Sequence, residues 1–90
     1  MQAEIPAKTK PIGQKQIGRY LVADPEICHG KLTFAGTRVL VRPVLAYIAS
    51  GKTIDWVLSE WPQLSREAIT EAIHLATDSL IERYESQHAA

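Results

Sequence analysis

The sequence is poor in the features that mark secreted and membrane-spanning proteins. It contains one cysteine, Cys28, so these 90 residues can form no disulfide among themselves and suit a reducing compartment. No stretch approaches the roughly 18 consecutive apolar residues of a membrane-spanning helix. Lys8 and Lys10 are not followed by the apolar core of a signal peptide. We therefore expect a cytoplasmic protein with no membrane contact.

A net charge is also missing, but the charges are unevenly distributed. The sequence holds ten Lys and Arg residues against ten Asp and Glu residues. Residues 1–42 contain seven basic and three acidic residues, a net charge of +4, whereas residues 43–90 contain three basic and seven acidic residues, a net charge of −4. A split of this kind predicts that the two halves face different partners.

Motifs for catalysis and metal binding are absent as well. His29, His74 and His88 lie far apart in sequence, and with Cys28 as the sole thiol they give no zinc-ligand spacing. The segment Gly30-Lys31-Leu32-Thr33 lacks the upstream glycine of a phosphate loop, and no Gly-x-Ser-x-Gly elbow occurs. We expect no enzymatic activity, no catalytic residues, no cofactor and no metal site.

The N-terminal half predicts a short β structure behind an irregular segment. Residues 1–18 contain scattered proline and glycine without a sustained period, so we expect a flexible arm. Residues 19–23 predict a short strand that Asp24-Pro25 ends. Alternation in residues 31–35, a turn at Gly36-Thr37 and a second strand over residues 38–42 predict a β hairpin.

The C-terminal half predicts three helices with clear boundaries. Pro43 suits the first position of a first helix, Gly51 its end, Thr53 the cap of a second and Ser65 the cap of a third. The third helix is expected to reach about Tyr84. The inward-facing residues are expected to be Val44, Leu45 and Ile48, then Ile54, Val57, Leu58 and Trp61, then Ile69, Ala72, Ile73, Ala76 and Leu80.

The expected fold is thus mainly α, a three-helix homeodomain-like helix-turn-helix with an N-terminal β hairpin. The single domain would span residues 19–84, between a flexible N-terminal segment of residues 1–18 and a frayed tail of residues 85–90. A domain this small buries only about 60–65% of its unfolded surface, so self-association would add useful burial. We expect a homodimer.

Nucleic acid is one candidate partner, and four basic residues are candidates for its contact: Lys31, Arg38, Arg42 and Arg66. Period two would place Arg38 and Arg42 on one face of the expected strand, where a basic ribbon could read a DNA groove. Alternatively, Arg38 pairs with Asp24 or Glu26 to close the hairpin. Arg66 stands at the start of the third helix, but residues 66–85 carry a net charge of −3. Phosphate repulsion would therefore oppose major-groove binding by that helix.

A protein partner is the other candidate. Trp56 lies about 200° around its helix from Ile54, and Leu75 is similarly off the stripe of the third helix. A tryptophan away from the apolar stripe marks a candidate interface. A second packing face within the domain or at a dimer contact explains both residues equally well.

Four motifs in order resemble the small bacterial DUF433 family. Its members have an Asp-Pro-x-Ile-x-x-Gly segment, a Gly-Thr-Arg strand, a Gly-x-Ser/Thr-Ile helix start and a Tyr/Trp-Pro-x-Leu turn. The matching residues are Asp24-Pro25-Glu26-Ile27-Cys28-His29-Gly30, Gly36-Thr37-Arg38, Gly51-Lys52-Thr53-Ile54 and Trp61-Pro62-Gln63-Leu64. The likeness covers about residues 20–80. Members often have Lys/Arg-Pro after the hairpin glycine, where this chain has Lys31 and Leu32.

The resemblance implies a function. Many DUF433 members resemble antitoxins of type II toxin–antitoxin pairs, encoded beside a PIN-like ribonuclease toxin. It implies a protein that binds and neutralises such a toxin and binds its own promoter DNA. A stand-alone DNA-binding regulator and a non-catalytic dimeric interaction module are the alternatives that the sequence leaves open.

Overall fold

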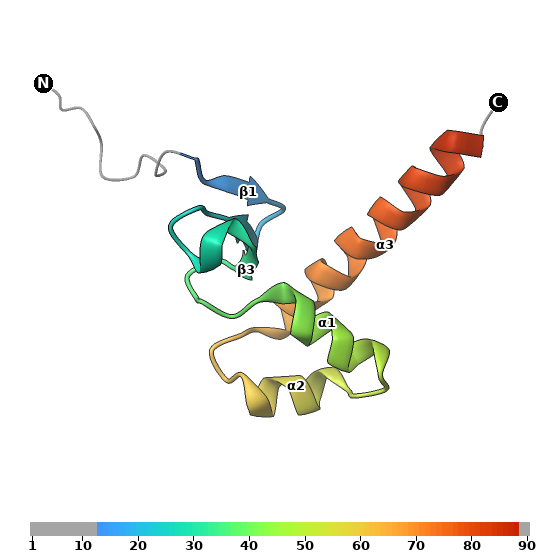
Figure 1. Ribbon diagram of the computed structural model, residues 1–90. Helices are drawn as coiled ribbons and strands as arrows, with labels where there is room; N and C mark the ends of the chain where they lie inside the picture. The colour runs from blue at the N-terminus through green and yellow to red at the C-terminus, as the bar shows by residue number, and fades with distance from the viewer. Residues whose placement is uncertain (1–12, 89–90) are drawn as a thin grey trace, which may run out of the picture.

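A small antiparallel sheet precedes three helices in the computed structural model, which describes residues 13–88 (Figure 1). The sheet contains β1 (Lys15–Ile17), β2 (Leu21–Ala23) and β3 (Leu32–Phe34). The helices are α1 (Val41–Ala49), α2 (Ile54–Glu60) and α3 (Arg66–His88). The small, mainly α fold expected from the sequence is confirmed. In residues 13–88 no helix is long and apolar enough to cross a membrane.

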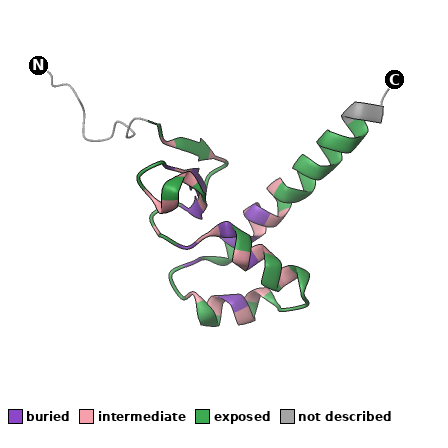
Figure 2. Ribbon diagram, in the orientation of Figure 1, coloured by how far each residue is buried: buried purple, intermediate pink, exposed green. Residues whose placement is uncertain are grey.

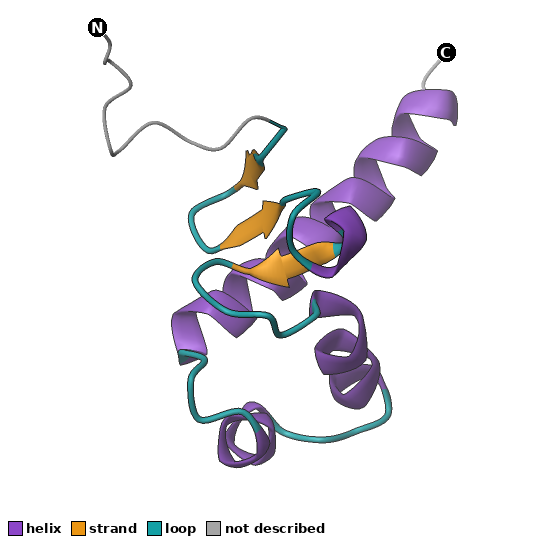
Figure 3. Cartoon of the chain, turned by 60° about the vertical axis from the view of Figure 1, so that its left-hand side comes forward, coloured by secondary structure: helices purple, strands orange, loops and turns teal. Residues whose placement is uncertain are grey.

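The sheet has three strands, as many as expected, but they are not the same three: β2 and β3 fall within the expected strands of residues 19–23 and 31–35, and β1 was not expected. Its order is β1-β2-β3, with both neighbouring pairs antiparallel (Figure 3). Leu21 of β2 lies opposite Ile17 on one side and Phe34 on the other. The unexpected strand, β1, lies within residues 1–18, where we expected a flexible arm; the rest of that expectation, residues 1–12, is outside the described residues.

The prediction of a strand over residues 38–42 is wrong. Only an isolated bridge joins Leu40 to Thr33, and α1 already begins at Val41, two residues before Pro43. Pro43 occupies the third helical position, which it can do because the first N–H groups of a helix need no partner within the helix. The expected strand face with Arg38 beside Arg42 therefore does not form.

The expected starts of α2 and α3 are confirmed by side-chain caps. The Thr53 hydroxyl accepts a hydrogen bond from the Trp56 N–H at 3.0 Å, and the Ser65 hydroxyl accepts one from the Ala68 N–H at 3.1 Å. Such caps satisfy N–H groups that the first helical turn leaves without partners. Gly51 follows α1 with φ of 107°, a conformation that costs glycine little.

The core lies where the sheet, α1, α2 and the first part of α3 meet. Phe34 and Leu21 enter it from the sheet, Val44 from α1, Val57 from α2 and Ile69 from α3, each at most 2% exposed. The other buried members are Val39, Val41, Leu64, Ala68 and Ala72. One apolar cluster therefore joins elements from both halves of the chain.

A carboxylate fixes the sheet to α3. Glu71 accepts hydrogen bonds from the N–H groups of Arg19 and Tyr20, both at 2.7 Å, in the turn between β1 and β2. Gly18, with φ of 65°, lets this turn lie against the Glu71 carboxylate, because a Cβ at this position would lie 2.7 Å from a Glu71 oxygen. The close approach requires glycine at this position and positions the sheet beside the first turns of α3.

Candidate functional site

The C-terminal part of α3 leaves the rest of the molecule. Ala68, Ile69 and Ala72 are buried in the core, and Leu75 is the last residue of α3 that packs against it. Every side chain from residue 76 to residue 85 is exposed, and the helix projects away from the other elements (Figures 1 and 2). We call residues 13–75 the body and residues 76–88 the arm.

The arm carries three of the four large apolar side chains that the structure exposes most: Leu80 at 56%, Ile81 at 46% and Tyr84 at 53%. At 100° per residue these three lie within about 100° of one another on one side of the helix. The expectation that Ala76 and Leu80 face the core is wrong, because α3 outruns the body. The arm instead presents an apolar stripe to solvent.

Carboxylates border this stripe. Asp78, Glu82 and Glu85 lie next to one another on the adjoining side of the helix, and Arg83 is the arm's one basic residue apart from His88. α3 also continues to His88, beyond the expected end at Tyr84, so residues 85–88 of the expected tail are helical. The arm is therefore an acidic, amphipathic helix.

Two of the four basic candidates line the same groove, which lies between β3 and the start of α1. Lys31, just before β3, and Arg42, in the first turn of α1, both line a groove of about 560 Å³. The remaining lining residues are apolar: Leu32, Leu40, Val41, Pro43 and Leu45. We call this surface the basic groove.

Arg38 is exposed in the loop that leads to α1. The alternative in which Arg38 pairs with Asp24 or Glu26 is not observed among the described residues. Asp24, 3% exposed, instead accepts hydrogen bonds from the Gln14 side chain at 3.0 Å and from the Glu26 N–H at 2.9 Å. The carboxylate thus stabilises its own turn and leaves the guanidinium of Arg38 to solvent.

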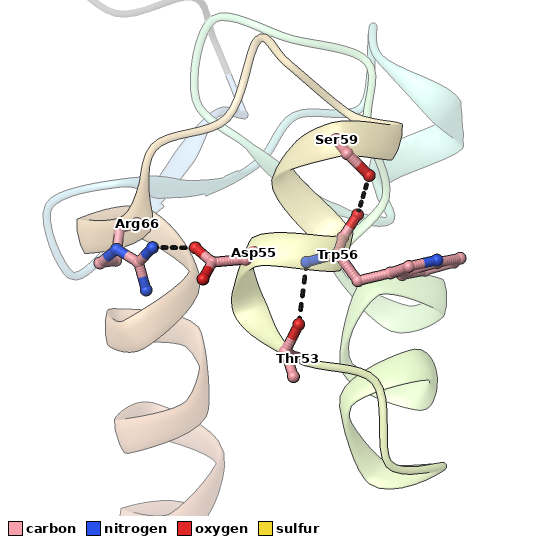
Figure 4. Close-up of polar contacts among 5 residues, drawn as sticks. All are labelled: Thr53, Asp55, Trp56, Ser59 and Arg66. Atoms are coloured by element: carbon pink, nitrogen blue, oxygen red, sulfur yellow. Dashed lines mark hydrogen bonds and ion pairs between the residues drawn. The ribbon is translucent and has the colours of Figure 1, made fainter.

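Arg66, the fourth basic candidate, forms an ion pair with Asp55 of α2 (Figure 4). Both side chains are more than half exposed, so the pair contributes little to stability, about 0–1 kcal/mol. The ion pair does affect the local charge, because the Asp55 carboxylate offsets the positive charge of Arg66 at the start of α3. Glu67 follows directly, so this end of α3 offers little positive charge to a phosphate backbone.

The two expected interface residues lie on the body. Trp56 is half-buried, with its ring centroid 4.9 Å from that of Tyr47 and the Lys52 ammonium 4.8 Å from its ring centre. Leu75 is half-buried against the core. Periodicity alone did not mark Leu80, Ile81 and Tyr84 as an interface. Helix length could have indicated them. The third periodic segment is more than twice as long as either of the helices it packs on, so its last turns extend past them.

In residues 13–88 no three or more His, Cys, Asp or Glu side chains gather closely enough to hold a metal ion. The lone thiol, Cys28, is half-buried and donates a weak hydrogen bond to the Arg38 carbonyl at 3.7 Å. The candidate binding surfaces are therefore the arm and the basic groove.

Comparison with known protein families matches residues 21–76 to a family described as a protein of unknown function (DUF433). The match runs from the start of β2 to the first residue of the arm, and it covers more than half of the chain. No curated protein and no solved structure matches this chain. The match thus covers the body from β2 onward, whereas β1 and nearly all of the arm lie outside it.

Proposed function

This chain belongs to the DUF433 family, and from that premise we propose that it is a non-catalytic, antitoxin-like protein of the cytoplasm that binds and neutralises a PIN-like ribonuclease toxin. The observation that carries the proposal is the arm. Its exposed residues Leu80 and Ile81 offer an apolar stripe, and Asp78, Glu82 and Glu85 offer negative charge beside it.

A ribonuclease is a complementary partner on physical grounds. It must bind the phosphates of RNA, so its substrate surface is basic, and an acidic helix competes for the same charges. An amphipathic helix laid into an apolar groove is a recurring mode of protein recognition. The arm would thus neutralise the toxin by covering the surface that RNA needs.

The test is co-expression of the full chain with the protein encoded beside it, followed by size-exclusion chromatography with light scattering and a ribonuclease assay. We expect a stoichiometric complex without nuclease activity. The double variant Leu80→Ser/Ile81→Ser should weaken the complex at least about tenfold, because buried apolar anchors dominate interface energies. Ser79→Ala, on the other side of the arm, is the matched control. A complex unaffected by the double variant would exclude the arm as the binding surface.

A second candidate function is binding to promoter DNA, favoured by the convergence of Lys31 and Arg42 on the basic groove with Arg38 in the adjoining loop. The three helices would form the homeodomain-like helix-turn-helix of such a protein, with the groove rather than the start of α3 against the phosphates. Binding to the chain's own upstream DNA should weaken with salt. Lys31→Ala and Arg42→Ala each remove one cation from the phosphates, so each should make the dependence of log K on log salt shallower by about 0.9. No binding at low salt would remove this candidate.

A further inference from the structure

The basic groove has the chemistry to accept an acidic amphipathic helix. Its floor is apolar, with Leu32, Leu40 and Leu45 among its lining residues, and Lys31 and Arg42 supply two positive charges. The first turn of α1 adds to them, because Leu40 at its N-cap has no polar side chain and no acidic residue follows in that turn. The N-terminal end of a helix carries a partial positive charge that favours carboxylates. A ligand for this groove should be apolar and negatively charged together.

The arm of the same protein has that composition. Leu80, Ile81 and Tyr84 form an apolar stripe, and Asp78, Glu82 and Glu85 lie along one border of it. The 13 residues of the arm, 76–88, extend about 20 Å at the rise of an α-helix. A helical segment of this length gains little stability alone, so a surface that covers its stripe would stabilise it.

The arm cannot fill the groove of its own chain. α3 is fixed to the body by Ile69 in the core and by the hydrogen bonds of Glu71 to the turn between β1 and β2. From there the helix runs outward, away from the start of α1, and the side chains of residues 76–85 stay exposed (Figures 1 and 2). A groove and an arm that are complementary but point apart can meet only between two molecules.

We propose that two copies of this chain exchange their arms, each arm lying in the basic groove of the other copy. Such a dimer is isologous and closed, because each copy donates one arm and accepts one, and every contact is made twice. It covers the exposed stripe and places the carboxylates of the arm beside Lys31 and Arg42. The dimer requires no toxin or DNA, so it stands or falls separately from the proposed function.

Charge selects this arrangement over direct pairing of two arms. Two arms packed side by side would bring together Asp78, Glu82 and Glu85 from both copies, against a single Arg83 in each. Like charges brought together in an interface are unfavourable, whereas an acidic arm on the basic groove gains from opposite charge. If a toxin also binds the arm, it must displace the second copy, so toxin binding would convert the dimer into a different complex.

The first measurement is the mass of the full chain in solution by sedimentation equilibrium, from low micromolar to several hundred micromolar protein. We expect a monomer–dimer equilibrium whose Kd rises when NaCl is raised from about 0.05 M to about 0.5 M, because salt screens the charge pairs. A chain that stays monomeric throughout this range would overturn the proposal.

The decisive measurement is a charge exchange. Lys31→Glu/Arg42→Glu reverses the groove, and Glu82→Lys/Glu85→Lys reverses the arm; all four side chains are exposed. Each double variant alone should have its dimer Kd raised at least about tenfold, because its arm and groove now repel. An equimolar mixture of the two should dimerise again, since each copy then finds a complementary arm and groove. The recovery would also show that both variants are folded.

Three results would contradict arm exchange. Groove variants that dimerise as the wild type does, while arm variants do not, would place the contact between arms or elsewhere on the body. A mixture that remains monomeric, with helix content by circular dichroism equal to the wild type, would show that the charges do not meet. Loss of DNA binding in Lys31→Glu/Arg42→Glu with an unchanged dimer Kd would assign the groove to DNA instead.

Discussion

The first ten residues of α3, Arg66–Leu75, and the last thirteen, residues 76–88, belong to one continuous helix but differ in what surrounds them. The first part has a Ser65 cap, three buried side chains and a carboxylate that holds the sheet. The arm has an exposed apolar stripe and clustered negative charge. The first part is held by the core, whereas the side chains of residues 76–85 in the arm are exposed.

The family match ends close to the boundary between the body and the arm. It ends at residue 76, one residue into the arm, so the body from β2 to Leu75 lies within the match and residues 77–88 lie beyond it. Nearly all of the arm therefore lies outside the matched segment. A comparison of substitutions in the body with matched substitutions in the arm tests this division directly.

The largest expected effect is in the core of the body. Phe34→Ala should lower the free energy of unfolding by about 3–5 kcal/mol, because a 1% exposed aromatic side chain leaves a cavity. Leu80→Ala should change it by less than about 0.5 kcal/mol. Urea denaturation at low micromolar protein, where dimers do not contribute, measures both.

Phe34→Leu keeps the first comparison measurable if Phe34→Ala does not fold, with an expected cost of about 1.5 kcal/mol or less. An arm substitution as costly as the core substitution at low protein concentration would mean that the arm packs on its own body. The division between body and arm would then be wrong.

The next effect is at the link between the sheet and α3. Glu71→Ala removes two hydrogen bonds to a charged acceptor and should cost about 2 kcal/mol, whereas Glu71→Gln keeps one acceptor oxygen and should cost about half as much. Glu67→Ala, one turn earlier and exposed, is the control. Hydrogen exchange should show the loss of protection concentrated in β1 and β2. Loss spread evenly over α1 and α2 would contradict the local role of Glu71.

Two identical substitutions, one at the cap of α3 and one within the arm, should have opposite effects. Ser65→Ala removes the cap that accepts from the Ala68 N–H and should cost about 1 kcal/mol. Ser79→Ala, in the exposed arm, replaces serine by a better helix former and should slow hydrogen exchange of the arm slightly. Equal effects of the two substitutions would show that α3 behaves as one unit.

The sequence predicted the elements whose signals are local. Thr53 and Ser65 were expected as caps because a hydroxyl before an apolar period satisfies N–H groups, and both do so. It failed at residues 38–42, where an alternating pattern reads as a strand. Val39 and Val41 are both buried, one in the loop and one in the first turn of α1, and only their tertiary contacts decide this.

The candidate site was harder to predict for the same reason. Lys31 and Arg42, two of the four basic candidates, line one groove, but that groove depends on β3 lying beside the start of α1. Leu80 fits the periodic stripe of α3 as well as Ile69 does. Periodicity shows which side of a helix is apolar but not where the body that covers it ends.

The smallest expected effect is also a stabilising one, like that of Ser79→Ala. In the arm, Asp78 and Glu82 are four residues apart and Glu85 is three further on, so like charges face one another along the helix. Each such pair destabilises a helix by about 0.2–0.5 kcal/mol. Glu82→Lys turns both pairs into attractive ones and should therefore slow hydrogen exchange of the arm, while the stability of the body stays unchanged.

The same Glu82→Lys substitution should weaken binding by the arm, both in the exchanged dimer and to a basic toxin. Gain of helix stability together with loss of binding would show that the acidic residues of the arm serve its partner at a cost to the helix itself. The control is Arg83→Gln, which removes a charge on the other border of the stripe and should leave binding to a basic surface intact or slightly stronger. If Glu82→Lys stabilised the arm and left every interaction unchanged, the negative charge would have no role in binding, and the arm would differ from the body only in lacking a core.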